Sequence, residues 1–383
     1  MIAIFDPIVG ASVGDASAVT AIVLARLLIP LLIPRVPLVI DSADQDLVKL
    51  FTEIDTSENG PYQSWDKALD IWYLSIAYLA ALRNWTSDSA FHIGQFLFYY
   101  RLVGGMLFEL SEERTMLLLF PNTFEYFFIL YEIVRLRREP SRFSARFWLL
   151  AAAGLWVFVK LPQEYWIHVA KLDFTDTFTE YPAFAVAVVA GLLLAALVLM
   201  FVVLPRLPAA DWGWRFASDP LPSSLVAAHA RFARRLESGR VLTREAFEEV
   251  LLLTLLGVIF ASILPGVEAT VLQVAVGVTA IVLANAAISL QAARLGRLRV
   301  QSAAAEYAAL LPTNLALVYA ASAVLGDRRD FELGAGLFFA FLIATIIWLF
   351  DAFRPVHELR FAGSPLRVRS IADLFKRARE RRP

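Results

Sequence analysis

The chain has 383 residues, of which 58% are hydrophobic and 13% aromatic, and its mean hydropathy is +0.61. Soluble domains have about 45–50% apolar residues, and the excess here lies in blocks of about 20 residues, the helix length that crosses a bilayer, so an ordinary soluble domain is excluded. The formal net charge is −1 and there is no cysteine, which excludes disulfides, thiolate nucleophiles and cysteine-ligated metal or iron–sulfur sites.

The apolar blocks predict an all-α protein, a polytopic transmembrane helix bundle of about ten spans. The predicted spans are 17–40, 67–83, 90–110, 115–136, 145–169, 182–204, 246–265, 268–292, 304–325 and 333–353. The first fifteen residues lack the basic segment that opens a signal peptide, so we expect the first span to be retained.

Acidic residues gather where the first span ends and the second begins. Asp41, Asp44 and Asp46 follow the first span, and Asp66 and Asp70 open the second, one helical turn apart. Carboxylates supply the oxygen ligands that a divalent cation needs, and an aspartate can act as a general base. The hypothesis is a metal or catalytic site in this loop, with a divalent cation as the candidate cofactor. The alternative is a solvated acidic loop.

The third and fourth spans carry charge at membrane depth. Arg101 lies in the middle of the third span and cannot lose its charge. Asn122, Glu125 and Glu132 share one face of the fourth span, and Glu125 needs either a partner on another helix or a bound proton. Two interpretations stay open. Arg101 and Glu125 form a structural ion pair, or Arg101 and Asn122 bind an anionic substrate while Glu125 takes part in catalysis.

The stretch KLPQEYWIHVAK ends the fifth span. It places four polar residues on one helix face: Lys160, Glu164, His168 and Lys171. Pro162, within the same stretch, is expected to kink the helix. In the functional interpretation the face lines an outward-facing cavity, where Lys160, Gln163 and Lys171 bind substrate and Glu164 and His168 handle protons. In the alternative, Lys160 and Glu164 form a structural pair at an interfacial helix end.

The sequence predicts four regions along the chain. They are a polar-lined membrane bundle of about six spans (1–204), a basic cytoplasmic loop (205–245), an apolar membrane bundle of about four spans (246–353) and a basic cytoplasmic tail (354–383). Within the loop, LVAAHARFARRLESG predicts an amphipathic helix that lies on anionic lipid or binds a partner. The apolar bundle contains the isolated polar residues Gln273, Asn285 and Asn314.

Arginine clusters predict the topology. They lie between spans four and five, between spans six and seven, after span eight and in the tail, whereas the opposite loops are acidic or mixed. By the positive-inside rule these arginines and both termini are cytoplasmic.

The excess of arginine over lysine and the many alanines are typical of GC-rich bacteria, so we expect a multi-pass protein of a bacterial cytoplasmic (inner) membrane. The expected partners are membrane lipids, a lipid-phosphate substrate and other membrane subunits. We expect no nucleic acid, because the basic residues follow topology.

An aspartate-bearing external loop directly after the first span resembles the polyprenyl-phosphate-dependent glycosyltransferases of the GT-C type. The resemblance covers about the first 70 residues and is one of position. It implies that Asp41 or Asp44 is the catalytic base. The large external domain common in that family has no counterpart in the sequence. As a whole, the chain resembles uncharacterised multi-span membrane proteins of GC-rich Gram-positive bacteria, which implies no activity.

Three functions are compatible with these features. The first is a membrane-embedded enzyme, a transferase that acts on a lipid or polyprenyl phosphate at the outer leaflet. The second is a proton- or ion-coupled transporter or channel, in which Glu125, Glu132, His168 and Lys160 form the relay. The third is a non-catalytic subunit of a larger membrane complex, in which the apolar second half is a docking surface.

Overall fold

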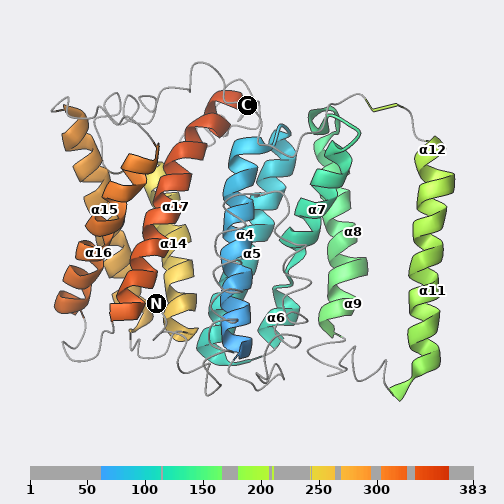
Figure 1. Cartoon of the computed structure of the whole chain (residues 1–383), viewed down its shortest axis with the longest axis horizontal. Coiled ribbons are helices and arrows are strands. Elements are labelled where there is room, and N and C mark those ends of the chain that lie inside the picture. Colours follow the sequence, from blue (N-terminus) through green and yellow to red (C-terminus); the bar gives the residue numbers. More distant parts are fainter. Residues whose placement is uncertain are drawn as a thin grey trace, which may run out of the picture. The chain divides into compact units, whose positions relative to one another are not determined.

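The computed structural model describes residues 62–113, 115–165, 180–206, 209–210, 242, 244–263, 269–294, 303–325 and 333–361. All regular secondary structure within these ranges is helical, which confirms the all-α prediction for this part of the chain (Figure 1). The first predicted span, the acidic loop before residue 62, the predicted helix of the basic loop and the end of the tail lie outside the described residues.

The bounds of the described helices are as follows. They are α4 (Tyr62–Asn84), α5 (Asp88–Ser111), α6 (Thr115–Leu119), α7 (Thr123–Arg135), a 3₁₀ turn (Pro140–Arg142), α8 (Ala145–Leu155), a π-helix (Trp156–Lys160), α9 (Leu161–Glu164), α11 (Pro182–Val198), a second π-helix (Leu199–Val203), α12 (Leu204–Arg206), α14 (Arg244–Ile263), α15 (Val271–Arg294), α16 (Ala303–Leu325) and α17 (Leu333–Arg360).

Six helical segments among the described residues are long and apolar enough to cross a membrane. They are Thr115–Arg135, Ala145–Glu164, Arg244–Ile263, Val271–Gln291, Tyr307–Val324 and Gly336–Glu358, which coincide with predicted spans four, five and seven to ten. Helices α4 and α5 have comparable length, at 23 and 24 residues, but carry more polar side chains. By length and composition, the chain is a multi-pass membrane protein.

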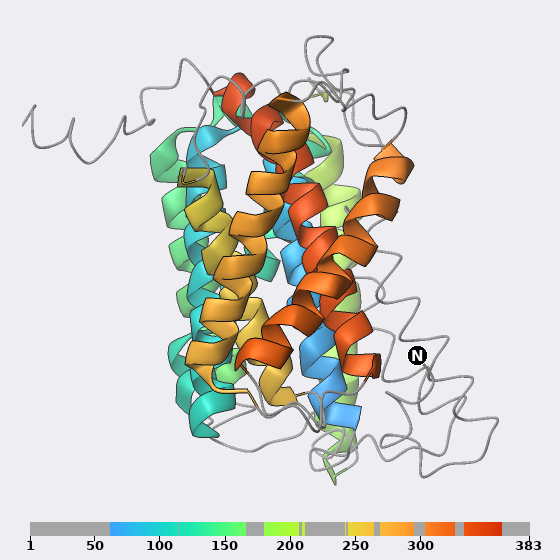
Figure 2. The ribbon, with the colours of Figure 1, turned by 90° about the vertical axis from the view of Figure 1, so that its left-hand side faces the viewer.

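The described helices group into two compact units. Unit 1 comprises Met1–Gln95 and Phe216–Pro383, and its described part contains α4, the start of α5 and α14 to α17. Helix α17 packs against α4, α14 and α16 (Figure 2). From Leu69 onward the side chains of α4 are mostly buried, with Trp72 and Tyr78 fully inaccessible to solvent.

Helices α4 and α17 run in the same direction. Trp72, in the first half of α4, lies against Phe341 in the first half of α17, with 5.6 Å between ring centroids. At the other end, Arg360 Nη1 donates to the carbonyl oxygens of Arg83 (2.7 Å) and Trp85 (2.8 Å). The guanidinium thus satisfies carbonyls that the end of α4 leaves without intrahelical donors.

The isolated polar residues of the apolar half have local partners. Asn285 on α15 donates from Nδ2 to Asn314 Oδ1 on α16 at 2.8 Å, and both side chains are buried. Such a bond between membrane helices contributes about 0.6 kcal/mol on average. Gln273 instead caps α15, since its Oε1 accepts from the Thr270 backbone N–H and the Gln273 N–H donates to Thr270 Oγ1. This is a capping box at the start of the helix.

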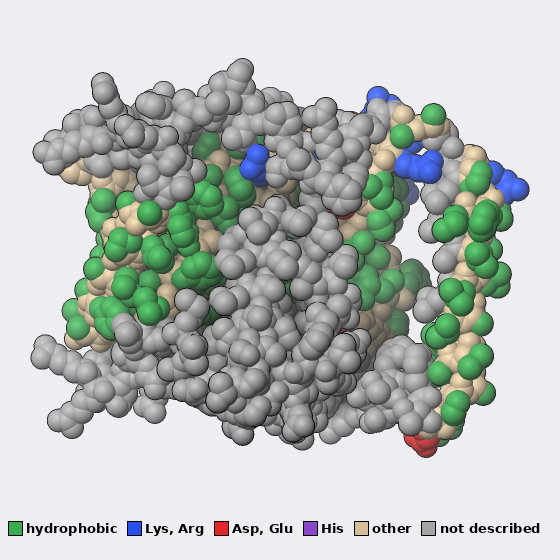
Figure 3. Space-filling view, viewed as in Figure 1, with side chains coloured by type: hydrophobic (Ala, Val, Ile, Leu, Met, Phe, Trp, Pro, Cys, Tyr) green, Lys and Arg blue, Asp and Glu red, His purple; other side chains and the backbone are tan. Residues whose placement is uncertain are grey.

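Unit 2, Phe96–Arg215, contains the rest of α5 and the described helices from α6 to α12. Its core is aromatic: Trp148 of α8 is fully buried, with its ring centroid 5.3 Å from that of Tyr131 on α7. The described side chains of α11 are mostly exposed and apolar along the helix (Figure 3). A helix that is hydrophobic all round is suited to contact with lipid.

The π-helices Trp156–Lys160 and Leu199–Val203 each end two residues before a proline, Pro162 in the first case and Pro205 in the second. Proline has no backbone N–H, and its ring clashes with the carbonyl four residues back. A wider turn relieves this conflict, because bonds then skip to the fifth residue, as in the Leu161 N–H to Trp156 O bond. At Pro162, where the sequence predicts a kink, the structure has a π-helical segment directly before the proline turn.

Candidate functional site

The fourth predicted span is a broken helix. Helix α6 ends at Leu119 and α7 begins at Thr123, so Phe120, Pro121 and Asn122 interrupt it. Pro121 cannot donate a backbone hydrogen bond, which removes one bond of the helical ladder at this point. Non-helical backbone at membrane depth is tolerated only where protein or a water-filled cavity satisfies its polar groups.

Helix α5 supplies two donors to the broken end of α6. Tyr100 Oη donates to the Leu119 carbonyl oxygen at 2.8 Å, and Arg101 Nη1 donates to the Phe120 carbonyl oxygen at 3.3 Å. One turn further, Gly104 lies so close to Phe120 that a Cβ at position 104 would overlap the Phe120 Cβ. Tyr100 and Arg101 thus satisfy the carbonyl groups at the break, and Gly104 leaves the space that Phe120 occupies.

Arg101 has a different partner from the one predicted. In the part of the chain that the structure describes, its guanidinium bonds to the Phe120 carbonyl rather than to the Glu125 carboxylate, and its buried Nε has no hydrogen-bond partner. The physical reason is the break itself, which leaves a carbonyl oxygen without its helical donor. The sequence did not show that this carbonyl would be there to compete with Glu125.

Glu125 occupies the first turn of α7, and Asn122 directly precedes the helix. Asn122 Nδ2 donates to Glu125 Oε2 at 2.6 Å, so the structure brings these two predicted site residues together. The helix macrodipole favours a negative charge at this position. Asn122 and Glu125 thus form a polar pair at the start of the second half of a broken span.

The buried end of the fifth span forms a second polar group beside α7. Lys160 Nζ lies 3.4 Å from Glu164 Oε1, donates to Gln163 Oε1 at 3.0 Å, and sits 4.7 Å from the centre of the Tyr126 ring. Tyr126 Oη donates to the same Gln163 oxygen at 3.1 Å. Lys160 and Glu164 are only 5% and 6% exposed, so the ion pair is almost completely shielded from solvent.

The remaining predicted site residues are placed only in part. Asp41, Asp44, Asp46, His168 and Lys171 lie outside the described residues. Asp66 and Asp70 lie one turn apart at the start of α4, as their spacing predicted. Among the described residues there is no group of three or more acidic or histidine side chains that could hold a metal ion. The divalent-cation site stays a prediction.

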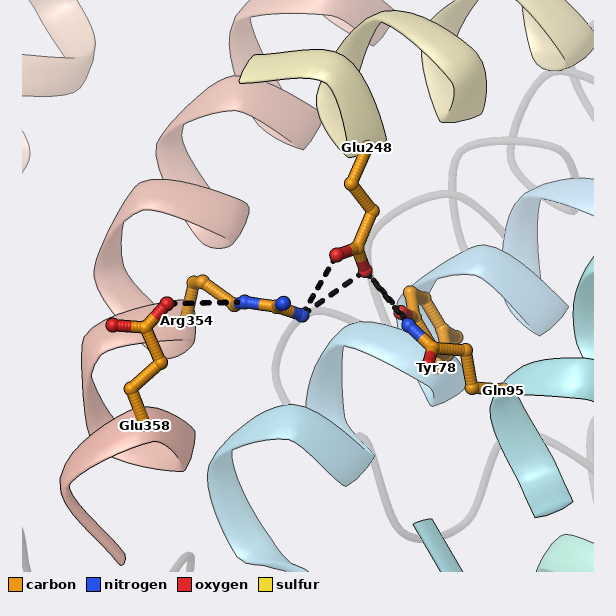
Figure 4. Close-up of polar contacts among 5 residues, drawn as sticks. All are labelled: Tyr78, Gln95, Glu248, Arg354 and Glu358. Atoms are coloured by element: carbon orange, nitrogen blue, oxygen red, sulfur yellow. Dashed lines mark hydrogen bonds and ion pairs between the residues drawn. The ribbon is translucent and has the colours of Figure 1, made fainter. Parts of the chain in front are cut away.

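Unit 1 contains a further network that the sequence interpretation missed (Figure 4). Glu248 Oε1, on α14, accepts from Tyr78 Oη on α4 (2.7 Å) and from Gln95 Nε2 on α5 (2.9 Å). Arg354 Nη1, on α17, lies 2.9 Å from Glu248 Oε2 and 3.1 Å from Oε1. Arg354 Nε also lies 3.5 Å from Glu358 Oε1 on its own helix. Four helices therefore meet at one carboxylate.

Two signals in the sequence pointed to this network. The stretch REAFEEV opens the seventh predicted span with three glutamates, and Arg354 and Glu358 are four residues apart, the spacing of an intrahelical ion pair. The last span was predicted to end at 353, just before Pro355, and both residues were therefore assigned to the tail. Helix α17 instead continues to Arg360 with Pro355 inside it, which brings Arg354 and Glu358 into the bundle.

Comparison of the chain with protein-family models found no match, and comparisons with curated proteins and with solved structures found none either.

Proposed function

We propose that this protein binds the phosphate of a lipid or polyprenyl phosphate at the break between α6 and α7, and acts on that lipid as a membrane-embedded transferase. Its proposed setting is a bacterial cytoplasmic membrane, crossed ten times, with both termini cytoplasmic and the site open to the outer leaflet. The observation that carries the proposal is the state of Arg101, a permanent cation on a membrane helix whose partner among the described residues is one backbone carbonyl.

A guanidinium at membrane depth is costly unless it is paired or lines a polar cavity. Arg101 has five N–H donors, and one of them is used on the Phe120 carbonyl oxygen. A phosphate accepts two parallel bonds from the guanidinium fork and neutralises its charge. An anionic head group would therefore supply the counter-charge and the hydrogen-bond acceptors that the described residues around Arg101 do not provide.

The apolar surface next to the polar groups fits the hydrocarbon part of such a ligand. Val157, Phe158 and Val159 precede Lys160 and are 50%, 81% and 37% exposed, respectively. In a bilayer this surface faces acyl or prenyl chains, while the side chain of the next residue, Lys160, is buried. Lys160 would form a second phosphate contact by exchanging its bond to Gln163 for one to the head group.

The transferase step follows the resemblance of the first external loop. In this step the lipid phosphate carries a glycosyl group, as the resemblance implies. Asp41 or Asp44 takes the proton from an acceptor hydroxyl as the hydroxyl oxygen attacks the glycosyl carbon bonded to the phosphate oxygen. The bond between that carbon and the phosphate oxygen breaks, the glycosyl group passes to the acceptor, and the lipid phosphate leaves as an anion bound by Arg101. If Asp44→Asn folds and keeps full turnover, Asp44 has no part in this step.

Binding measurements on protein in lipid nanodiscs test the phosphate site. Arg101→Gln is expected to lower the affinity for a polyprenyl phosphate at least tenfold, since a charge-assisted hydrogen bond contributes about 1.5–3 kcal/mol. The affinity for the corresponding polyprenol, which lacks the phosphate, should not change. Arg146→Gln, at an exposed position of α8, is the matched control. Equal phosphate affinity in the Arg101→Gln and Arg146→Gln variants would contradict the proposal.

A proton-coupled transporter is the second candidate, and the buried Lys160–Glu164 pair beside a broken helix favours it. Discontinuous helices carry the binding sites of many transporters, and buried ionisable pairs mark their proton paths. This function predicts that the proton flux into proteoliposomes changes in the Glu125→Gln variant. Proton flux in the parent protein without turnover of a polyprenyl phosphate would favour transport over group transfer.

A further inference from the structure

The turn that joins α7 to α8 is strongly basic. Residues 137–146 contain one glutamate and four arginines, which are Arg137, Arg138, Arg142 and Arg146. Arg142 and Arg146 are exposed, and the other two arginines are partly exposed. Basic side chains are visible at this end of the described helices (Figure 3). The turn therefore presents an excess of positive charge to its surroundings.

Aromatic packing and a helix cap fix the shape of this turn. The Phe143 ring centroid lies 4.6 Å from that of Phe147 and 5.8 Å from that of Trp148, which is fully buried. Ser144 Oγ accepts from the Phe147 N–H at 3.3 Å and so caps the start of α8. The two exposed arginines therefore lie on a defined element, so a ligand that binds them has little backbone to order.

Apolar side chains are exposed next to these arginines. Leu136, directly after α7, is 44% exposed, and Phe147, Leu149 and Leu150, at the start of α8, are 37%, 60% and 60% exposed. Arg146 and Leu150 are four residues apart on α8 and share one face of that helix. The surface thus has a cationic end and an apolar side, an arrangement that matches the head group and the acyl chains of a bilayer lipid.

The other end of the neighbouring broken span has the opposite charge. Glu112 and Glu113 precede α6, and both are exposed. An anionic head group is attracted to the α7–α8 turn and repelled at Glu112 and Glu113. In the predicted topology the α7–α8 turn is cytoplasmic, so a lipid bound there belongs to the inner leaflet. The lipid phosphate proposed to bind Arg101 enters from the outer leaflet instead.

We propose that the α7–α8 turn binds an anionic phospholipid of the inner leaflet, with its phosphate at Arg142 and Arg146 and its acyl chains along Leu149 and Leu150. The guanidinium groups donate charge-assisted hydrogen bonds to the phosphate oxygens. A zwitterionic lipid binds less well, because its own ammonium group compensates the phosphate charge. Free phosphate binds less well because it makes no contact with the leucines. This site is separate from the one at Arg101 and does not rest on the proposed transferase function.

Native mass spectrometry of the protein titrated with phosphatidylglycerol in detergent measures this binding. Arg142→Gln with Arg146→Gln is expected to lower the affinity for phosphatidylglycerol about tenfold, since each arginine near an anionic head group contributes to binding. The affinity for phosphatidylcholine should not change. Inorganic phosphate should not displace phosphatidylglycerol from the parent protein.

The matched control is Arg206→Gln with Arg244→Gln. It also removes two exposed arginines that are predicted to be cytoplasmic, and these two flank the basic loop in which a lipid-binding helix is predicted. The control variant should bind phosphatidylglycerol as the parent does. Unfolding followed by tryptophan fluorescence shows that each variant is folded. Should a double variant fail to fold, Arg142→Gln alone is compared with Arg206→Gln alone, and about a threefold loss is expected in the first.

A photoactivatable phosphatidylglycerol, with a diazirine in its acyl chain, locates the bound lipid. It should label residues 147–153 of α8 in the parent protein, and this labelling should fall in the Arg142→Gln, Arg146→Gln variant. The proposal is overturned if the control variant loses as much affinity, because binding then follows total charge or the basic loop. An equal loss for phosphatidylcholine, an unchanged affinity in the Arg142→Gln, Arg146→Gln variant, or displacement by inorganic phosphate would overturn it as well.

Discussion

At the scale of single residues, two cations of unit 2 have different kinds of partner. Lys160 is paired with Glu164 one turn along its own helix and lies over the Tyr126 ring. Arg101 has a backbone carbonyl of a broken helix. A buried ion pair is weak evidence for stability, but removal of one partner leaves an uncompensated charge. Substitution of Lys160 or Glu164 alone is therefore expected to lower the free energy of unfolding more than substitution of both together.

Lys160→Met should lower the free energy of unfolding by about 3–5 kcal/mol, because Glu164 then loses its buried cation. The double variant Lys160→Met with Glu164→Leu should recover most of this loss, since no charge remains buried. Thermal unfolding in detergent, followed by tryptophan fluorescence, measures both. Arg146→Gln, which is exposed, should stay within about 0.5 kcal/mol of the parent. A double variant as unstable as the single one would show that Lys160 acts through packing instead of charge.

At the scale of elements, prolines shape the membrane helices in two ways. Pro121 coincides with a break between α6 and α7, whereas Pro162 and Pro205 each follow a π-helix within a continuing helix. The break persists because α5 satisfies it with Tyr100 and Arg101 and leaves room for it at Gly104. The fit of α5 to the break, and not Pro121 alone, positions the candidate site.

Gly104→Ala tests this fit. Its Cβ would overlap Phe120, so we expect a loss of about 1–3 kcal/mol in the free energy of unfolding. Gly154→Ala in α8 is the matched control, because no atom lies within 4 Å of the added Cβ. There the change should stabilise the helix, by up to about 1 kcal/mol from helix propensity. If both variants unfold at the same temperature, Gly104 of α5 does not pack closely against Phe120 at the break.

At the scale of the whole molecule, the directions of the unit 1 helices agree with the predicted alternation of spans. Helices α4 and α17 end where α5 and α14 begin, since Tyr78, Gln95, Glu248 and Arg354 share one network. Spans two and ten are predicted to run outward to inward, and spans three and seven to run back. The number of spans and the side on which the termini lie stay predictions.

Two exposed serines at opposite ends of the unit 2 helices test that topology. Ser111 ends α5, and Ser141 lies in the 3₁₀ turn between α7 and α8. A membrane-impermeant maleimide should label Ser111→Cys in intact cells, and Ser141→Cys only after permeabilisation, because the arginines around 141 are predicted to be cytoplasmic. The reverse pattern would invert the topology. Labelling of both positions in intact cells would mean that α6 and α7 do not cross the membrane.

The sequence by itself determined the helical fold class and the membrane setting. Both follow from a local property, the apolar blocks of bilayer length. The Thr270–Gln273 capping box, which fixes one helix end, is also local, but it was recognised only in the structure. The sequence also predicted the Lys160–Glu164 pair, since both residues lie on one helix at a spacing that brings them together.

Only the tertiary structure decided which distant groups meet. Glu248 and Arg354 are far apart in sequence, and Arg101 takes a carbonyl that exists as an acceptor because a neighbouring helix is broken. The same holds for α17, which continues through Pro355 to Arg360 within a packed bundle. Helical periodicity states which residues share a face but not which helix that face meets, and charge pairing between helices depends on that contact.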